Sequence, residues 1–387
     1  GAYNITIPDT TLLLTYSMIG YELKRVPIKG STVVNVTLEP DLVGISEIVV
    51  IGYGKQTKED LTGSVTSINK KSFKNQPITS LEQIIQGRSA GVEVSNSSGA
   101  PGGDVKIRIR GANSIFGNNN PLVVIDGIVD ADMNNITAND IESIELLKDA
   151  SSTAIFGSRG ANGVVLVTTK SGSSDEVRIN VNTFYSVRTL PKKIDFLNAS
   201  QFVELYNIYD STMRYVPGFN FTPAFSDDEV AYFEENPGTD WQDELFRTAT
   251  ASNIELSVQG GDKNMNYYIS GGYINEEGIL INTDFKRYNI NAKISARLSK
   301  KIKISTNIIA SQKYGHNNLE VGSQYSPIGR LPQWVATEPV WDESGDFYNY
   351  SPDHGAVTGN PVGIQMTQNS YQTKKTFIPS GNITYQL

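Results

Sequence analysis

After residue 176 the sequence alternates between apolar and polar side chains in six separate stretches. Alternation with a period of two is the pattern of a β-strand that has one apolar face and one polar face. Five of the six stretches have the roughly 9–11 residues with which a strand crosses a membrane. The stretches run from Val177 to Val187, Ile254 to Val258, Met265 to Tyr273, Tyr288 to Leu298, Ile302 to Ala310 and Phe377 to Leu387.

The connections between these stretches differ in length in a regular way. Residues 189–250 and 311–375 form long connections, whereas residues 260–263 and 299–301 form tight turns. Membrane β-barrels have long loops at one end and short turns at the other. A soluble β-sandwich has no reason to place every short turn at one end. The second half of the chain is therefore predicted to be an antiparallel transmembrane β-barrel.

Composition excludes several classes of protein. The net charge of −8 among 387 residues argues against a protein that binds a nucleic-acid backbone, which would need a basic surface. No stretch approaches the roughly 18 apolar residues of a spanning helix, so a helical membrane protein is excluded. The absence of cysteine excludes disulfides, thiolate metal sites and cysteine nucleophiles.

Residues 55–172 have a different pattern, which predicts a small mixed α/β domain. Apolar residues at helical spacing follow Ser80, which is available as an N-cap, and Gly87 is a stop signal. Strict alternation from Val105 to Arg110 predicts one strand. Apolar runs predict buried strands at Leu122 to Ile125, before the turn Asp126-Gly127, and at Val164 to Thr169.

The blocks from Asn120 to Gly127 and from Asp140 to Lys170 carry a resemblance to a known family. They closely resemble the plug domain of the SusC/RagA family of TonB-dependent outer-membrane transporters. The resemblance implies a mainly β protein with four parts. They are the end of a carboxypeptidase-regulatory-like β-sandwich (1–41), a Ton box and linker (42–54), the plug (55–172), and the first strands and outer loops of the barrel (173–387). About six strands cannot close a barrel of this class, so the barrel is expected to be incomplete in this chain.

The apolar segment before Gly52 has two interpretations. Periodicity alone allows one more buried strand. The resemblance implies a Ton box, which would add a strand to a sheet edge of the TonB C-terminal domain through backbone hydrogen bonds. Its residues would be Ser46, Glu47, Ile48, Val49, Val50 and Ile51.

The resemblance also implies the partners and the location. The protein would lie in the bacterial outer membrane, in contact with its lipid, and import oligosaccharides or peptides. A SusD-like surface lipoprotein would act as its lid, and TonB with its proton-driven inner-membrane motor would displace the plug. Two other classes stay open: a surface glycan-binding receptor or adhesin that does not transport, and a secreted soluble glycan-binding protein.

Charged residues of the plug suggest how it is held in the barrel. Arg108 and Arg110 share one face of their strand, and Arg159 lies in a glycine-flanked turn. Inside a barrel these arginines could pair with inward carboxylates such as Glu255 and form a plug–barrel latch. The alternative is that they are solvated charges on the face of a sheet.

Aromatic and amide side chains are the candidates for substrate contact. Aromatic rings stack on sugars or anchor a protein partner, and amides bind hydroxyl groups. The same rings could equally pack inside a structured loop. The candidates are Asn113, Phe116, Asn118 and Asn119 in the plug, and Trp334 and Trp341 in the second long connection.

No catalytic constellation is present. The two histidines, His316 and His354, both lie in the second long connection, and neither an HExxH nor a GxSxG motif occurs. The segment from Asp130 to Asn135 offers oxygen ligands but lacks the glycine and the terminal glutamate of a calcium-binding loop. We therefore expect no enzymatic activity, metal or cofactor.

Overall fold

A computed structural model describes most of the chain. The described residues are 13–16, 24–27, 36–37, 48–51, 54–57, 64–73, 78, 80–96, 99–103, 105–112, 114–115, 117–172, 176–213, 223–316, 326–348, 359–367 and 370–385. Among the predicted site residues, Ser46, Glu47, Asn113 and Phe116 lie outside them. Among the described residues, no helix is both long enough and apolar enough to span a membrane.

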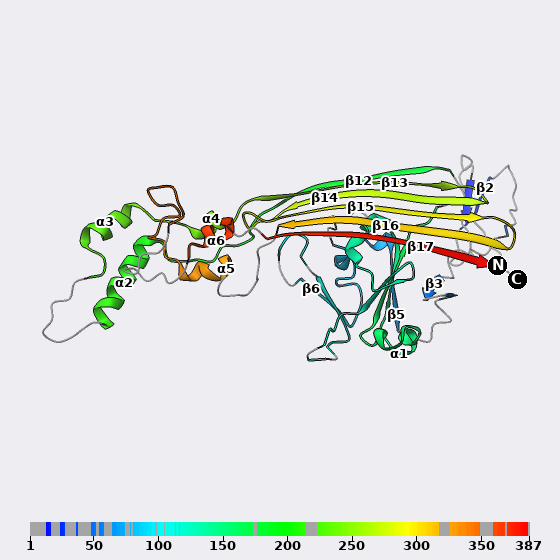
Figure 1. The fold of residues 1–387 in the computed structure, drawn as a ribbon, viewed down its shortest axis with the longest axis horizontal. Coiled ribbons are helices and arrows are strands. Elements are labelled where there is room, and N and C mark those ends of the chain that lie inside the picture. The colour runs from blue at the N-terminus through cyan, green and yellow to red at the C-terminus, as the bar shows by residue number, and fades with distance from the viewer. Residues whose placement is uncertain are drawn as a thin grey trace.

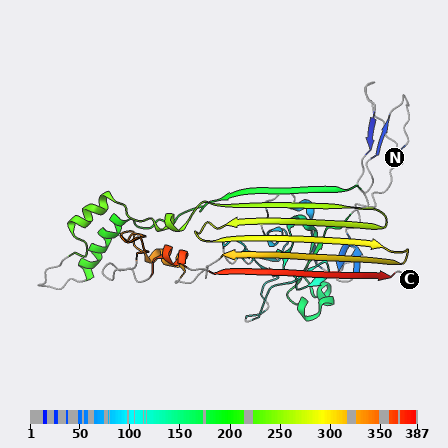
Figure 2. The same ribbon diagram turned by 45° about the horizontal axis from the view of Figure 1, so that its top comes forward.

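Six long strands form one antiparallel sheet in which each strand pairs with the next along the chain (Figures 1 and 2). All six predicted alternating stretches are therefore strands. The strands are β12 (Arg178–Arg188), β13 (Ala249–Gly261), β14 (Met265–Glu277), β15 (Asp284–Arg297), β16 (Ile302–His316) and β17 (Tyr371–Tyr385).

The two faces of this sheet differ as the alternation predicts. The face turned away from the plug exposes large apolar side chains, among them Val181 at 68 % and Ile290 at 56 %. The opposite face, which the plug covers, carries buried polar residues. Asn291 is fully buried there, and Asn307 is 5 % exposed. The sheet thus has its polar face inside and its apolar face outside, the reverse of a soluble protein.

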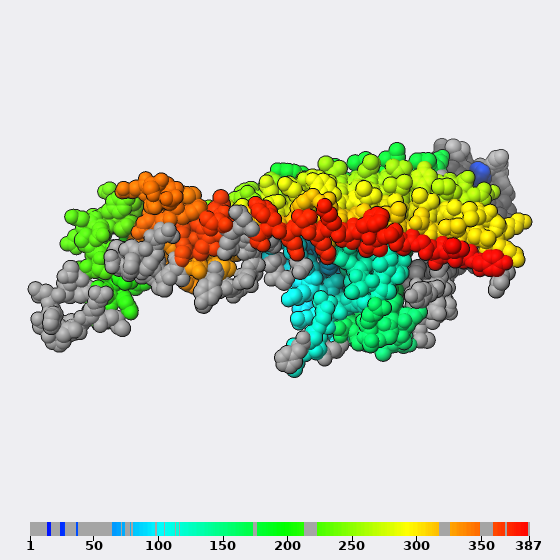
Figure 3. All heavy atoms as spheres, viewed as in Figure 1, coloured from blue at the N-terminus to red at the C-terminus, as the bar shows by residue number. Residues whose placement is uncertain are grey.

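The plug is a separate mixed domain that lies under the polar face (Figures 1 and 3). Its main sheet has the strand order β5-β10-β11-β8-β9, and β6 pairs with β7 in a second sheet. The strands are β5 (Val65–Asn69), β6 (Val92–Asn96), β7 (Val105–Ile109), β8 (Leu122–Ile125), β9 (Ile128–Val129), β10 (Ile141–Leu147) and β11 (Val164–Thr169).

Short helical turns complete the plug, and most are 3₁₀ turns. They are η2 (Lys70–Ser72), η3 (Leu81–Ile84), η4 (Met133–Asn135), η5 (Ala138–Asp140), α1 (Ala150–Thr153) and η6 (Ala154–Gly160). The helix expected after Ser80 is only the turn η3, and Ser80 does not cap it. The Ser80 hydroxyl bonds the Glu82 carboxylate instead, so the N-cap prediction is wrong.

The apolar core of the plug continues into the long sheet. It is built mainly from fully buried plug residues such as Ile84, Ile141 and Ile144. Ile309 of β16 belongs to the same cluster and is 1 % exposed, and Ile378 of β17 packs against it. These two residues are apolar side chains on a largely polar face, and they join the core of the plug to the sheet.

The long connections fold into a helical module beyond one end of the sheet (Figure 1). It holds α2 (Ala199–Met213), α3 (Asp227–Glu235), α4 (Trp241–Leu245), α5 (Pro327–Arg330), η7 (Leu331–Gln333) and α6 (Pro361–Thr367). A small core joins the two connections, with Trp241 from the first packed on Trp334 from the second. The short turns of the sheet lie at the opposite end.

Two further strand pairs precede the plug. Strands β1 (Leu13–Tyr16) and β2 (Lys24–Pro27) form an antiparallel pair within the region predicted to be the end of a sandwich. Strands β3 (Ile48–Ile51) and β4 (Gly54–Thr57) form a hairpin. Both β2 and β3 lie toward the end of the sheet that has the short turns (Figure 1).

Candidate functional site

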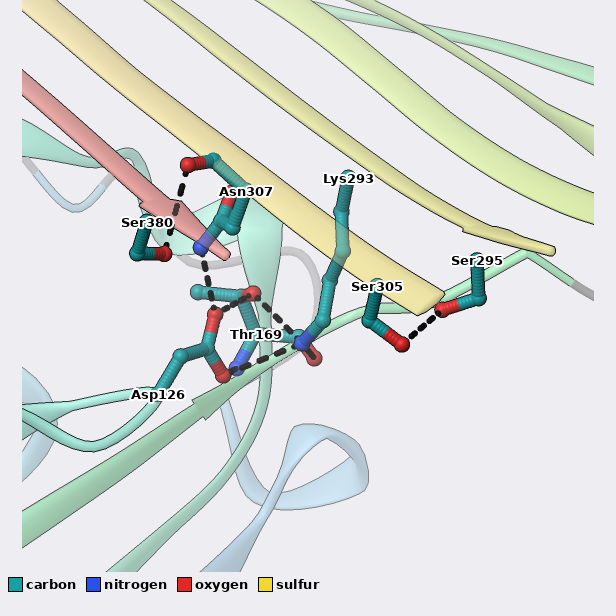
Figure 4. Close-up of polar contacts among 7 residues, drawn as sticks. All are labelled: Asp126, Thr169, Lys293, Ser295, Ser305, Asn307 and Ser380. Atoms are coloured by element: carbon teal, nitrogen blue, oxygen red, sulfur yellow. Dashed lines mark hydrogen bonds and ion pairs between the residues drawn. The ribbon is translucent and has the colours of Figure 1, made fainter. Parts of the chain in front are cut away.

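The Asp126 carboxylate is the centre of a polar network that joins the plug to the sheet (Figure 4). It accepts hydrogen bonds from the Lys293 ammonium (3.1 Å) on β15 and from the Asn307 amide (3.0 Å) on β16. Within the plug it accepts from the backbone N–H of Thr169 (3.0 Å) and from the Thr169 hydroxyl. The side chains of Asp126 and Lys293 are only 9 % and 20 % exposed. A half-buried charge pair of this kind is held by its several hydrogen bonds as well as by charge.

The local sequence explains why Asp126 points at the sheet. Val124 pairs with Val129 and Ile125 with Ile128, which leaves Asp126 and Gly127 as a two-residue turn. Both turn residues have positive φ, 48° and 86°. Such a turn favours aspartate followed by glycine because both residue types adopt positive φ readily. The Asp126-Gly127 turn therefore also directs toward the sheet the carboxylate that accepts from Lys293 and Asn307.

A second carboxylate, Asp132, joins the plug to the two strands at the edge of the sheet. It pairs with the ammonium groups of Lys313 (2.7 Å) on β16 and Lys374 (3.0 Å) on β17. It also accepts the backbone N–H of Asn134 (2.9 Å) and so begins η4. Burial by itself would raise the pKa of Asp132, but Lys313 and Lys374 outweigh it and lower the pKa to about 2. Asp132 is thus ionised at any physiological pH.

Four further side chains of the sheet donate hydrogen bonds to the plug segment 126–140. Asp140 accepts from the hydroxyls of Tyr268 (2.9 Å) and Ser270 on β14. The remaining contacts are Ser311 Oγ to Asn135 Oδ1 (2.9 Å) and Arg287 Nη1 to the Asn134 carbonyl (3.3 Å). In all these bonds the sheet donates and the plug segment accepts. We call these contacts, together with those of Asp126 and Asp132 to the sheet, the docking seam.

The structure corrects the predicted latch. Arg108, Arg110 and Arg159 are exposed, and the described residues hold no ion pair between any of them and Glu255. Glu255 does face the plug and is 5 % exposed, but its carboxylate accepts the Asn182 amide (3.1 Å) of the neighbouring strand. The polarity is reversed: the plug contributes the acids and the sheet the bases. Strand alternation identified the inward face but could not show which plug residues reach it.

A cavity of about 1080 Å³ lies next to the docking seam, at the end of the sheet near the helical module. Its walls are strongly polar and carry charges of both signs. Arg188 pairs there with Glu276 (2.8 Å). Burial raises the pKa of Glu82. The charged lining residues are Glu82, Asp132, Arg188, Glu276, Arg287, Lys313 and Lys374.

The plug loop Gly99–Gly103 reaches this cavity. The Gly102 N–H donates to Glu276 (3.2 Å), and a Cβ at Gly102 would lie 2.2 Å from the Phe285 ring. Gly102 also has a positive φ of 62°. The close approach of the loop to the sheet is what requires glycine here. A glycine cluster between two plug strands is the only sequence signal that could have marked this contact.

The two candidate tryptophans differ in how far they are exposed. Trp334 is 5 % exposed, packs on Trp241 (ring centroids 5.1 Å apart) and donates its indole N–H to the Gly359 carbonyl (3.1 Å). It is a core residue of the helical module, so its assignment to substrate contact is wrong. Trp341 is 51 % exposed and stacks on Phe347 at 4.3 Å, so its outer ring face is open to a ligand.

The plug amides Asn118 and Asn119 serve their own loop. The Asn119 side chain accepts the Ser114 N–H (2.8 Å) and donates to the Ser114 carbonyl (2.7 Å). The Asn118 side chain accepts the N–H of Asn120 (2.9 Å). Neither residue is among the described residues that line the cavity.

The described part of the predicted Ton box, Ile48–Ile51, is the strand β3. Its backbone pairs with β4, with Ile48 opposite Thr57 and Ile51 opposite Gly54. A two-stranded hairpin is marginally stable by itself and leaves one backbone edge of β3 unpaired by β4. The role of this segment as a TonB-binding strand stays a prediction.

Known proteins resemble both the sequence and the fold. The plug domain of TonB-dependent receptors matches residues 57–164. TonB-dependent receptor P26 of Formosa agariphila is 38 % identical and aligns with 100 % of this chain and 38 % of its own length. TonB-dependent receptor SusC of Bacteroides thetaiotaomicron is 33 % identical over 91 % of this chain and 35 % of its own length. The chain thus spans little more than a third of these relatives, and both are named as receptors.

A solved structure of the RagAB peptide importer in its open-open state superposes with a TM-score of 0.74. It covers 88 % of this chain and 41 % of that chain, at 23 % sequence identity. At this identity the likeness speaks for the fold alone. The long antiparallel sheet with a plug beneath it is therefore part of a barrel of the kind that such receptors have.

Proposed function

Because this chain belongs to the SusC/RagA type of TonB-dependent receptors, we propose that it forms part of an importer in the bacterial outer membrane. TonB pulls on residues 46–51, the docking seam opens, and the plug moves aside to admit the substrate. The docking seam carries this proposal. It joins a folded domain to the barrel wall largely through hydrogen bonds and ion pairs, which separate and re-form in water more readily than a continuous apolar core.

The long sheet supports the placement in a membrane. Its strands have 11 to 15 residues, at least the roughly 9–11 that cross a bilayer. The outward face is apolar, with Ile254, Leu256 and Phe377 each about half exposed or more. Tyr273 and Tyr288 pack at 4.8 Å near one edge of this apolar band, as in the aromatic girdle of a membrane barrel.

The connections support the orientation. Long loops of outer-membrane barrels face the cell exterior and short turns face the periplasm. The helical module would then lie outside the cell, where it can meet substrate and a SusD-like lipoprotein lid. Strand β3, which lies toward the short turns, would be within reach of the TonB C-terminal domain.

The substrate is proposed to be an oligosaccharide or a peptide. The cavity beside the docking seam has the position of a chamber above the plug, and its charged and amide groups suit a polar substrate. Trp341 offers an exposed ring in the outer module, suited to stacking on a sugar or to contact with the lid protein.

The test is a single proline substitution in β3 of the complete receptor, with a leucine substitution at the same position as control. Val50→Pro removes a backbone N–H that a TonB strand would need, whereas Val50→Leu keeps it. We expect Val50→Pro to abolish binding of the purified TonB C-terminal domain and growth on the receptor's nutrient, with substrate binding unchanged. Val50→Leu should behave like the unmodified protein. Full growth with Val50→Pro would contradict the proposal and favour a surface receptor or adhesin that does not transport.

A further inference from the structure

A second cavity, of about 690 Å³, lies at the same end of the sheet but on its outward face. Side chains of β15, β16 and β17 that point away from the plug form most of it. The plug-facing residues of the same strands, Arg287 and Lys313, belong to the first cavity. The outward lining includes Asp284, Lys286, Tyr288, Tyr314, His316 and Tyr371.

The position of this cavity limits what can occupy it. Tyr288 and Tyr314 pack edge to face at 6.3 Å and mark the rim of the apolar band. Below them on the outward face lie Ile290 and Phe377, which are 56 % and 68 % exposed. The cavity lies at and above the tyrosine rim, where an aromatic girdle meets lipid headgroups. An outward groove at this level contacts lipid of the outer leaflet.

Three of the side chains that line the cavity are of kinds that bind a sugar phosphate, beside the carboxylate of Asp284. Tyr371 is 72 % exposed and stacks flat on His316, with ring centroids 4.2 Å apart, so its outer face is a platform for a sugar ring. Lys286 is exposed, and the described residues hold no ion pair for it. The Lys286 ammonium group interacts electrostatically with the Glu277 carboxylate without a direct ion pair among the residues that the structure describes, so it stays available to attract a phosphate.

A buried unpartnered group points to a missing ligand. His316 is 5 % exposed, and its Nε2 atom is buried without a hydrogen-bond partner in the described part of the chain. Its other nitrogen, Nδ1, lies 3.8 Å from the Asp284 carboxylate. Buried polar atoms nearly always have a partner, so an unpaired nitrogen at a cavity wall indicates a site for a polar ligand.

We propose that this cavity binds the phosphorylated sugar headgroup of an outer-leaflet glycolipid. Lys286 faces the phosphate, Tyr371 stacks on the sugar, and His316 Nε2 bonds a hydroxyl or phosphate oxygen. The inference rests on the proposed membrane placement of the outward face. The bound lipid would hold the outer ends of β15, β16 and β17 together beside the helical module.

The test measures lipid binding by the complete receptor after its own lipid has been removed. The probes are phosphorylated lipid A, dephosphorylated lipid A and phosphatidylglycerol, each titrated in detergent. We expect phosphorylated lipid A to bind most tightly. Lys286→Gln should weaken it about tenfold, because a charged hydrogen bond is lost. Tyr371→Ala should weaken both forms of lipid A, since both carry the sugar.

A lysine at the other rim supplies the control. Lys301 lies 5.9 Å from the Tyr385 ring beside a short turn, so Lys301→Gln removes a lysine near an aromatic ring at the opposite end. We expect it to leave lipid A binding unchanged. Equal binding of all three lipids, or an equal loss with Lys286→Gln and Lys301→Gln, would overturn the proposal. Growth on the receptor's nutrient separates this site from the proposed function, because Lys286→Gln should import normally.

Discussion

At the scale of single residues, the docking seam concentrates on two carboxylates, and Asp126 is the more buried of them. Its four donors come from three segments that are far apart in the sequence. Removal of one partner from a buried pair leaves the other charge desolvated, which costs more than the pair contributes. The Asp126–Lys293 contact should therefore respond very differently to single and to paired substitution.

Asp126→Asn should destabilise plug docking by roughly 3 kcal/mol, because Lys293 keeps its charge but loses its counter-ion. Lys293→Met should cost less, and the double variant should recover part of the loss. The measurement is the urea concentration at which the plug becomes sensitive to protease in the complete receptor. Costs that simply add in the double variant would contradict a direct coupling of the two residues.

Asp132 predicts how plug docking depends on acidity. Its pKa in the folded protein is about 2, below the ordinary value of 3.8. A depressed carboxyl pKa stabilises the folded state fully above the ordinary pKa and loses that contribution as the pH falls through the folded value. The contribution is about 2 kcal/mol at most, and solvent screening reduces it.

The contribution of Asp132 to the stability of plug docking should therefore be constant above about pH 4 and should fall between pH 4 and pH 2. Asp132→Asn should be less stable at pH 7 and should lack this part of the acid dependence. Protease sensitivity of the plug, measured across that range for both proteins, checks the prediction. Identical acid profiles would show that Asp132 does not hold the plug.

At the scale of elements, the loop Gly99–Gly103 shows how a glycine serves docking. Gly102 has a positive φ, and a Cβ added to it would lie only 2.2 Å from a ring carbon of Phe285. A Cβ added to Gly99 would meet nothing within 4 Å. Gly102→Ala should cost roughly 1–3 kcal/mol through overpacking and strain, and Gly99→Ala less than about 0.5 kcal/mol. Thermal unfolding of the two variants compares them directly. Equal costs would mean that the loop does not rest on Phe285.

The elements also show what sequence can predict. Strands of the long sheet were predictable because one face meets apolar surroundings and the other a polar interior, and this contrast imposes alternation. The Asp126-Gly127 turn was predictable because few residues tolerate two positive φ values. The helical module was not predicted, because its core joins Trp241 and Trp334 across two connections that are distant in sequence. The predicted latch was assigned to the wrong plug residues, because a period of two gives the face on which Glu255 lies but not the partner of its carboxylate.

At the scale of the whole molecule, the fold arranges three parts along one axis. The helical module lies beyond the long-loop end of the sheet, the plug lies beneath the middle, and β3 lies toward the short-turn end (Figure 1). The charged cavity lies between the plug and the sheet, at the end toward the module and next to the docking seam. This order suits capture, passage and energy input at successive levels of one wall.

Import by the proposed route requires the plug segment 126–140 to leave the sheet. Asn135 and Ser311 lie on the two sides of the seam with side-chain atoms 2.9 Å apart, and the chain has no cysteine of its own. The most direct measurement is growth on the receptor's nutrient with Asn135→Cys and Ser311→Cys combined in the complete receptor. We predict that the oxidised receptor binds substrate but supports no growth, and that reduction restores growth. Equal growth with the disulfide formed would show that the seam stays closed during import and would contradict the account.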